Sequence, residues 1–446
     1  MTAEHRFSHA DLKKLIVPLF LEQLLVMLVG VADTFMVSFA GDAAVSGVSL
    51  VNMFVTFFIY VFTALASGGA VIVSQYIGRG DGDDAKRTAG QLLTVSALVS
   101  ALCMGLILLW NRPILRLLFG RVDDDVMAAC VTYQRIMAYS FIPMGVYNAG
   151  AAVCRSVNRT EVTLKVSVAA NLINVAGNAI GIFVLHAGVA GVAWPSFLAR
   201  LFSAIAVKCF CAGSGNPVRY LAKDIFTWNG GVIRRILRVA VPNSVESGTF
   251  QLIKVALSSI TARFGTAQIA ANGIAQTIWS LAALMVVTMG PVYITVIGQC
   301  MGAGAVEDAD YYFRKLTKLT LGAAVIWNIL IFALTPLIMR LYPLSDEITG
   351  LVVRLVLIHN TFNALVFPFG GALPNGLRAA GDIRFTMLVG IASTVLVRLL
   401  LSIVFGIWLN LGVIGIAWAM VCDWIARGVI FTLRYRQGKW KAMQVV

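Results

Sequence analysis

The chain has 446 residues, of which 59% are hydrophobic and only 13% are charged, and its formal net charge is +14. A soluble protein averages about 25% charged residues, so this chain has too few charges to cover a water-facing surface of its size. The composition therefore excludes an ordinary soluble protein and predicts an integral membrane protein.

Twelve apolar segments are each long enough for a membrane span, which needs about 20 residues. In chain order they cover 14–39, 48–76, 89–110, 126–151, 163–186, 190–211, 239–263, 269–299, 317–339, 349–375, 385–408 and 412–433. The longest polar stretch between them, 212–238, includes Gly213, Gly215 and Pro217. We therefore expect a first six-helix lobe over 1–211, a cytoplasmic linker over 212–238, and a second six-helix lobe over 239–446 that ends in a short basic tail.

Lys and Arg residues are distributed unevenly along the chain. With the N-terminus in the cytoplasm, 23 of the 35 fall in cytoplasmic segments, and the five in outer segments are Arg112, Arg116, Arg121, Arg263 and Arg340. Cytoplasmic loops of membrane proteins carry such an excess, so we expect a plasma (inner) membrane protein with both termini in the cytoplasm. The same bias explains the positive net charge without a nucleic-acid partner.

The two halves of the sequence match each other without gaps in a single register. Pro18 then aligns with Pro242, and Glu22 aligns with Glu246. Each half has six spans, an even number, so both halves insert in the same orientation, as in the parallel repeats of secondary transporters. The sequence thus predicts an all-α polytopic membrane protein of twelve transmembrane helices, in two six-helix lobes related by an internal parallel repeat.

Two carboxylates lie in the first span, Glu22 and Asp33. They are eleven residues apart, which places them within about 20° of one helical face. An ionised carboxylate is costly in lipid and normally faces a cavity or a partner. A carboxyl group that is neutral when buried and charged when wetted can couple a proton to a conformational change. We expect Asp33 to be the cation-coupling residue and Glu22 an additional carboxylate, with structural hydrogen bonding as the alternative for both.

Three amides, Asn171, Asn174 and Asn178, follow an i, i+3, i+7 spacing in the fifth span and so share one helical face. Amides often join membrane helices. The alternative, which we adopt, is that they hydrogen-bond Asp33 and line a cavity.

The second half has a different set of polar residues. Glu246 and Lys254 lie about 80° apart around the seventh span, and His359 and Asn363 lie one turn apart in the tenth. We expect these four residues to form a polar cavity in the second lobe. The alternative for His359 is a structural hydrogen bond.

Several segments carry a family resemblance. They are 18–23 (PLFLEQ), 31–38 (VADTFMVS), 188–194 (GVAGVAW) and 241–246 (VPNSVE), together with the paired 75–78 (QYIG) and 299–302 (QCMG). In this order, over the whole chain, they resemble the multidrug and toxic compound extrusion (MATE) family. The resemblance implies two six-helix lobes and cation-driven antiport of organic, often cationic, compounds.

Within that family the chain looks more DinF-like than NorM-like. Asp33 lies fifteen residues after Pro18, as does the proposed proton site of the DinF-like branch. Asn174 matches that branch's helix-five asparagine, but Asn178 replaces the aspartate that follows it, and an amide cannot titrate. The acidic residues of a NorM-like sodium site are not matched, because Glu246 lies too near the proline and 351–375 contains no acid.

The sequence and the resemblance together predict a secondary active antiporter that exports small amphipathic, cationic compounds in exchange for protons, which is multidrug (xenobiotic) efflux. We expect a functional monomer with no cofactor and no metal site; no motif indicates an enzyme. Sodium coupling is the nearest alternative. Another is a lipid-linked saccharide flippase, whose basic cavity Arg135, Arg200, Lys254, Arg354 and Arg398 could supply.

Overall fold

The computed structural model describes residues 6–120, 123–213, 216–220, 222–340, 345–443 and 445, and this part of the chain contains helices and no strand. Arg121 and Gly215, which the sequence places in an outer segment and in the linker, lie outside the described residues. The helices form two compact units. The first unit is His9–Ser244, and the second is Val245–Val446 with the described part of Met1–Ser8.

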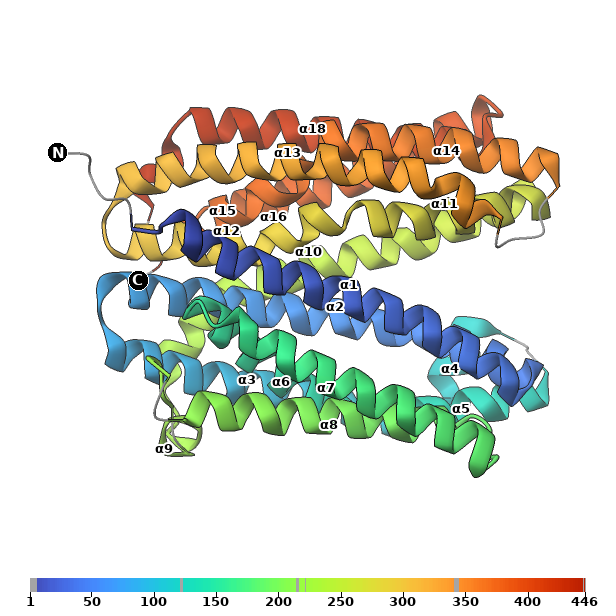
Figure 1. Cartoon of the computed structure of the whole chain (residues 1–446), viewed down its shortest axis with the longest axis horizontal. Helices are drawn as coiled ribbons and strands as arrows, with labels where there is room; N and C mark the ends of the chain where they lie inside the picture. The colour runs from blue at the N-terminus through green and yellow to red at the C-terminus, as the bar shows by residue number, and fades with distance from the viewer. Residues whose placement is uncertain are drawn as a thin grey trace. The chain divides into compact units, whose positions relative to one another are not determined.

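The first unit is drawn from blue to yellow-green in Figure 1. Its helices are α1 (His9–Val37), α2 (Asp42–Arg79), α3 (Gly82–Leu109), α4 (Asn111–Phe119), α5 (Asp124–Tyr139), α6 (Phe141–Ser156), α7 (Thr160–Ala179), α8 (Ala190–Ala212) and α9 (Ala222–Phe226), with the short segments η1 (Ser38–Ala40) and η2 (Ile180–Val184). Part of the predicted linker packs onto this unit, since Gln91 of α3 donates to the carbonyl oxygens of Asp224 and Thr227 at 2.9 and 2.7 Å.

The helix α10 (Gly230–Thr261) begins in the first unit and ends in the second. The second unit continues with α11 (Thr266–Ala282), α12 (Leu284–Gly302), α13 (Val306–Met339), α14 (Asp346–Leu365), α15 (Leu373–Ala380), α16 (Ile383–Ala392), α17 (Leu400–Ile403) and α18 (Gly412–Arg436). Its short segments are η3 (Ala262–Phe264), η4 (Pro368–Ala372), η5 (Ser393–Leu399), η6 (Val404–Trp408) and η7 (Lys439–Ala442).

Ten helices of the described chain are long and apolar enough to cross a membrane, and there are eleven spans if the pair α5 and α6, bent by 44°, is counted as one. Counted in this way, eleven of the twelve predicted spans are present by length and composition. The remaining one, 239–263, falls within α10. That helix is long enough, but its apolar run is interrupted by polar residues that include Glu246, Gln251 and Lys254.

The internal repeat is visible in the backbone, in the same register that aligns Pro18 with Pro242. Segment η1 recurs as η3, and η2 recurs as η6. Gly41 and Gly265, which end η1 and η3, both have a positive φ, of 100° and 90°. Glycine alone adopts such angles without strain, so these turns explain why the two glycines recur in register.

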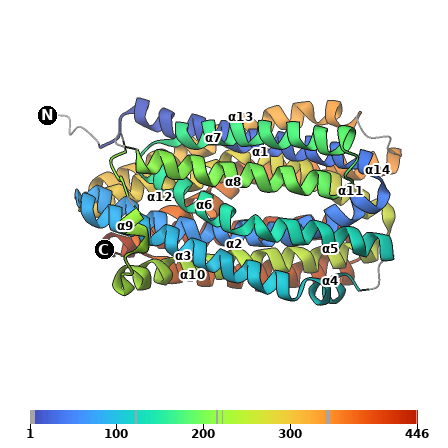
Figure 2. The same ribbon diagram turned by 90° about the horizontal axis from the view of Figure 1, so that it is seen from below.

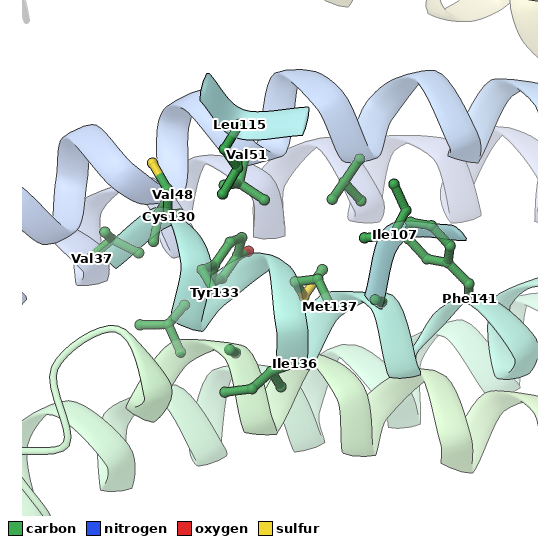
Figure 3. Packing of buried hydrophobic residues seen from close by; sticks show 14 of the residues in the cluster. Val37, Val48, Val51, Ile107, Leu115, Cys130, Tyr133, Ile136, Met137 and Phe141 are labelled. Carbon is green, nitrogen blue, oxygen red and sulfur yellow. The ribbon is translucent and has the colours of Figure 1, made fainter. Parts of the chain in front are cut away.

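A hydrophobic core in the first unit holds α2 and α5 together. Val48 and Val51 of α2 face Tyr133 and Met137 of α5, as Figure 3 shows, and all four are buried. The hydroxyl group of Tyr133 donates to Asn52 at 3.0 Å, so the buried phenol is not left without a partner. This core fixes α5 beside the helices that carry the candidate site.

Helices α1, α7 and α8 lie side by side in both views of the chain (Figures 1 and 2). The start of α8 packs unusually closely against η2, which continues α7. A Cβ atom added to Gly181 would lie 2.1 Å from the carbonyl oxygen of Gly191, so only glycine permits this approach. The contact fixes the end of α7 against α8, next to the asparagines of α7.

Candidate functional site

Asp33 of α1 faces α7, where two of the three predicted asparagines meet it. The amide nitrogen of Asn178 donates to Asp33 Oδ1 at 2.8 Å. Asn178 is fully buried, Asn174 is nearly so, and Asp33 is half-buried. The structure therefore brings together residues that are 145 positions apart in the chain.

The side-chain amide of Asn174 also contacts the Asp33 carboxyl group. With its nitrogen toward Asp33, it donates to Oδ1 and Oδ2 at 2.8 and 3.1 Å, and its oxygen accepts from the Ser196 hydroxyl group at 3.0 Å. This orientation pairs Asn174 with an ionised Asp33 and with Ser196, and it also places the Asn174 nitrogen 3.2 Å from the amide nitrogen of Asn178, which in the opposite orientation donates to the Asn174 oxygen. The opposite orientation places an amide oxygen against the carboxyl oxygens, which requires a proton on Asp33. The two amide orientations therefore correspond to the two protonation states of one carboxyl group.

Arg200 of α8 is a cation close to this group of residues. It lies within electrostatic range of Asp33 and Tyr133, but its guanidinium group donates to the Ser140 hydroxyl group at 2.6 Å rather than to the carboxylate. Asn171, the third predicted asparagine, bonds to Ser167 on its own helix at 3.3 Å. The structure thus groups Asp33 with Asn174 and Asn178, and the described hydrogen bond of Asn171 does not reach this group.

Glu22 belongs to a separate cluster nearer the start of α1. Its carboxylate accepts from Arg155 at 3.0 Å, from Thr163 at 2.7 Å and from Tyr147 at 3.2 Å. Only 3% of Glu22 is exposed. The cluster ties α1 to α6 and α7, and it satisfies Glu22 as a structural ion pair.

Replacing Glu22 with Gln should destabilise the protein by about 2 kcal/mol, because Arg155 loses the negative charge of Glu22. The expected cost lies below that for a fully buried ion pair, since 16% of the Arg155 side chain is exposed. Thermal unfolding in detergent measures this as a lower midpoint. Glu161→Gln is the control, since its pair with Arg159 is 3.8 Å long with side chains 46% and 43% exposed, and solvent-exposed pairs contribute little. A Glu22→Gln protein with unchanged stability and lost proton coupling would place Glu22 in the coupling site instead.

Glu246 forms an equivalent ion pair in the second unit. Its carboxylate accepts from Arg378 of α15 at 2.6 Å. Its other side approaches Gly390 of α16, where an added Cβ would lie 2.2 Å from Glu246 Oε1. The duplicated glutamate therefore keeps the same kind of partner in both halves of the chain.

The second unit also contains a buried ion cluster around Asp423 of α18, a residue that is 0% exposed. Arg398 and Arg427 each approach its carboxylate at 2.9 Å. Ser393 donates to the same carboxylate, and Arg427 also donates to the hydroxyl group of Thr394. Two arginines thus share one aspartate, and the cluster keeps one excess positive charge.

The other predicted residues of the second unit, His359, Asn363 and Lys254, have separate surroundings in the described part of the chain. His359 is buried, and neither ring nitrogen has a hydrogen-bond partner in the described part of the chain. Asn363 donates to Asn328 and to the carbonyl oxygen of Ala282, both at 3.0 Å, which joins α14 to α13 and α11. Lys254 is exposed on α10 and lies within electrostatic range of Arg398.

Sequence reasoning missed the arginine partners of the carboxylates, Arg155 and Arg378, and found only Arg398 of the Asp423 cluster. Asp423 and Arg427 do carry a detectable signal, because opposite charges four residues apart inside an apolar span are costly unless they pair. In the described residues, no three His, Cys, Asp or Glu side chains are grouped so that they could hold a metal ion.

The duplicated helical unit agrees with comparison to known proteins. A model of the MatE family matches residues 18–180 and 242–404, two segments that stand in the register of the internal repeat. The chain belongs to the MatE family. The family resemblance predicted from the sequence is confirmed, and membership makes the chain a multi-pass membrane transporter of a multidrug efflux family and not an enzyme.

MatE relatives cover nearly the full chain. The chain is 26% identical over 433 residues to the protein named uncharacterized transporter YisQ of Bacillus subtilis, in a match that spans 95% of this chain and 93% of YisQ. It is 24% identical over 446 residues to the protein named probable multidrug resistance protein NorM of Thermotoga maritima, with 98% and 94% covered. Its fold is similar to that of a MOP superfamily transporter from Pyrococcus furiosus, with a TM-score of 0.88, 18% identity, and 97% and 96% covered.

Proposed function

We propose that this MatE protein exports small amphipathic organic compounds in exchange for protons, and that Asp33 carries the proton. The observation that supports this is the difference between Asp33 and the other carboxylates inside the helices. Glu22, Glu246 and Asp423 are each paired directly with arginine, which favours the ionised form. Asp33 is instead held by the neutral amides of Asn174 and Asn178, so it can change its protonation state without leaving a buried arginine unpaired.

Asn174 supplies the coupling between this proton and the helices. When Asp33 is ionised, both amides donate to it and hold α1 against α7. When Asp33 is protonated, it donates to the oxygen of Asn174, whose nitrogen then turns to Ser196 of α8. The Asn174 side chain thus contacts Asp33 of α1 and Ser196 of α8 in both states, and the proton reverses the direction of both hydrogen bonds. Alternating access would follow from this change in hydrogen bonding.

The remaining features of the proposal follow the sequence. The six-helix lobes are 1–211 and 239–446 with the linker 212–238 in the cytoplasm, both termini are cytoplasmic, and the membrane is the plasma membrane. The protein functions as a monomer and belongs to the DinF-like branch. The resemblance also predicts that the exported compounds are cationic.

Proteoliposomes distinguish proton coupling from sodium coupling. We expect an imposed pH gradient alone to drive transport of an amphipathic dye, and a protonophore to abolish it. A sodium gradient at clamped pH should give no transport above that of empty liposomes. Transport driven by the sodium gradient alone would contradict the proposed coupling ion.

A further inference from the structure

The second unit carries two cations at or within one turn of the positions that match Asp33 and Asn174 of the first. In the register that aligns Pro18 with Pro242, Asp33 corresponds to Leu257, and Asn174 corresponds to Arg398. Gly30, one turn before Asp33, corresponds to Lys254. The duplicated helices therefore hold an acid and amides in one unit, whereas in the other an arginine replaces one amide, a leucine replaces the acid, and a lysine lies one turn before that leucine.

Lys254 and Arg398 are neighbours in the second unit. The guanidinium group of Arg398 lies over the ring of Phe250, 5.0 Å from its centre. Phe250 and Lys254 are four residues apart on α10, so they share one face of that helix. The two cations lie within electrostatic range of each other. One face of α10 thus places the ring of Phe250 against the guanidinium group of Arg398 and one helical turn from Lys254.

The positive charge of this region exceeds its negative charge. Glu246 is paired with Arg378, and Asp423 is shared by Arg398 and Arg427. The Lys254 ammonium group has no described hydrogen bond or ion pair, and the Nε of Arg398, a residue only 6% exposed, has no hydrogen-bond partner in the described chain. A charged ammonium group within a predicted span is energetically costly unless it pairs with an opposite charge. The excess positive charge of this region therefore favours the binding of an anion.

The backbone differs between the two units at this same place. Arg398 lies in the π-helical segment η5, whereas its counterpart Asn174 lies in the regular helix α7. A π-helical turn places residues five apart on one turn, so Ser393 and Arg398 both reach Asp423. Such turns are frequent at functional sites, and this one fixes the guanidinium group that faces Phe250.

We infer that Lys254 and Arg398 form a binding site for the anionic group of an amphipathic substrate, a carboxylate, sulfonate or phosphate. Phe250 supplies apolar contact beside that group. The inference rests on the proposed transport function and names its substrate class, which differs from the cationic compounds that the family resemblance predicts. The first unit then holds the proton and the second unit holds the charged end of the substrate.

Two dyes of nearly the same shape and opposite charge test the inference. Fluorescein is an anion and rhodamine 6G is a cation, and both share a xanthene frame. Fluorescence polarisation with the purified full-length chain in detergent should show tighter binding of fluorescein. Lys254→Gln should weaken fluorescein binding by about tenfold or more, as expected for loss of one charge-assisted contact. Lys254→Arg should restore most of it, and rhodamine 6G binding should not weaken in either variant.

Lys208→Gln is the matched control, because Lys208 is an exposed lysine on another helix, α8. It should leave fluorescein binding unchanged. Inorganic phosphate lacks an apolar frame that could contact Phe250, so at a concentration equal to that of the dye it should not displace it. Displacement at equal concentration would show a site for free anions and overturn the assignment to an amphipathic substrate. Equal binding of both dyes, absence of fluorescein binding, or an unchanged affinity in folded Lys254→Gln would overturn the inference. Binding needs no proton gradient, so these outcomes are independent of the coupling ion.

Discussion

Replacing Asp33 with Asn should abolish proton-coupled transport in proteoliposomes. Asn cannot take up or release a proton, yet it keeps the size of Asp and can still bond to the amides of Asn174 and Asn178. We therefore expect a folded protein whose transport rate, driven by a pH gradient, falls by about 100-fold or more, the loss typical of removing an essential proton carrier. Dye transport and the accompanying pH change in the liposome lumen measure both sides of the exchange.

Asp42→Asn provides the control for this experiment. Asp42 lies nine residues later, at the exposed start of α2, and the substitution removes the same charge from the same unit. We expect its transport to match that of the wild type. Undiminished proton-driven transport by Asp33→Asn would remove Asp33 from the coupling mechanism.

Replacing Asp423 with Asn should destabilise the second unit more than any other single change of charge discussed above. Arg398 and Arg427 would be left as two buried cations without their shared counter-ion. Removing one partner of a buried ion pair typically costs about 3–5 kcal/mol. A lower thermal midpoint in detergent, and less folded protein after membrane extraction, should report the loss.

A double variant separates the charge effect from a simple packing defect. Arg427→Gln in the Asp423→Asn background removes one of the two unpaired cations. We expect the double variant to be more stable than the sum of the two single losses predicts, which a double-mutant cycle measures. Additive losses would show that the three side chains do not act as one charge cluster.

Much of the fold could be predicted from the sequence because two signals are local. Apolar runs of membrane length locate the spans, and glycines that need positive φ mark equivalent turns such as Gly41 and Gly265 in the two halves. The boundary between α11 and α12 escaped detection, because both are apolar and the break between them falls at a single residue, Ala283. The π-helical turn η5 could not be predicted from the apolar pattern either, because residues were placed on helical faces by the α-helical period of 3.6 residues, which a π-helical turn does not follow.

The candidate site could be predicted only where residues share a helical face. Asn174 and Asn178 lie on the face of α7 that meets Asp33, as their spacing indicated, whereas Asn171 bonds within its own helix. The pairing of Glu22 with Arg155 joins residues 133 positions apart. Such a contact depends on how helices pack, and periodicity within one helix contains no information about it.

Proton release on substrate binding tests the central proposal most directly. A dye that the transport assay shows to be exported is added to the purified chain in weakly buffered detergent near neutral pH, and the pH is followed. If Asp33 exchanges its proton for substrate, the wild type should release on the order of one proton per dye molecule bound, by linkage of the two equilibria. The Asp33→Asn protein should bind the dye and release none. Equal release by both proteins, or no release by the wild type, would contradict the account.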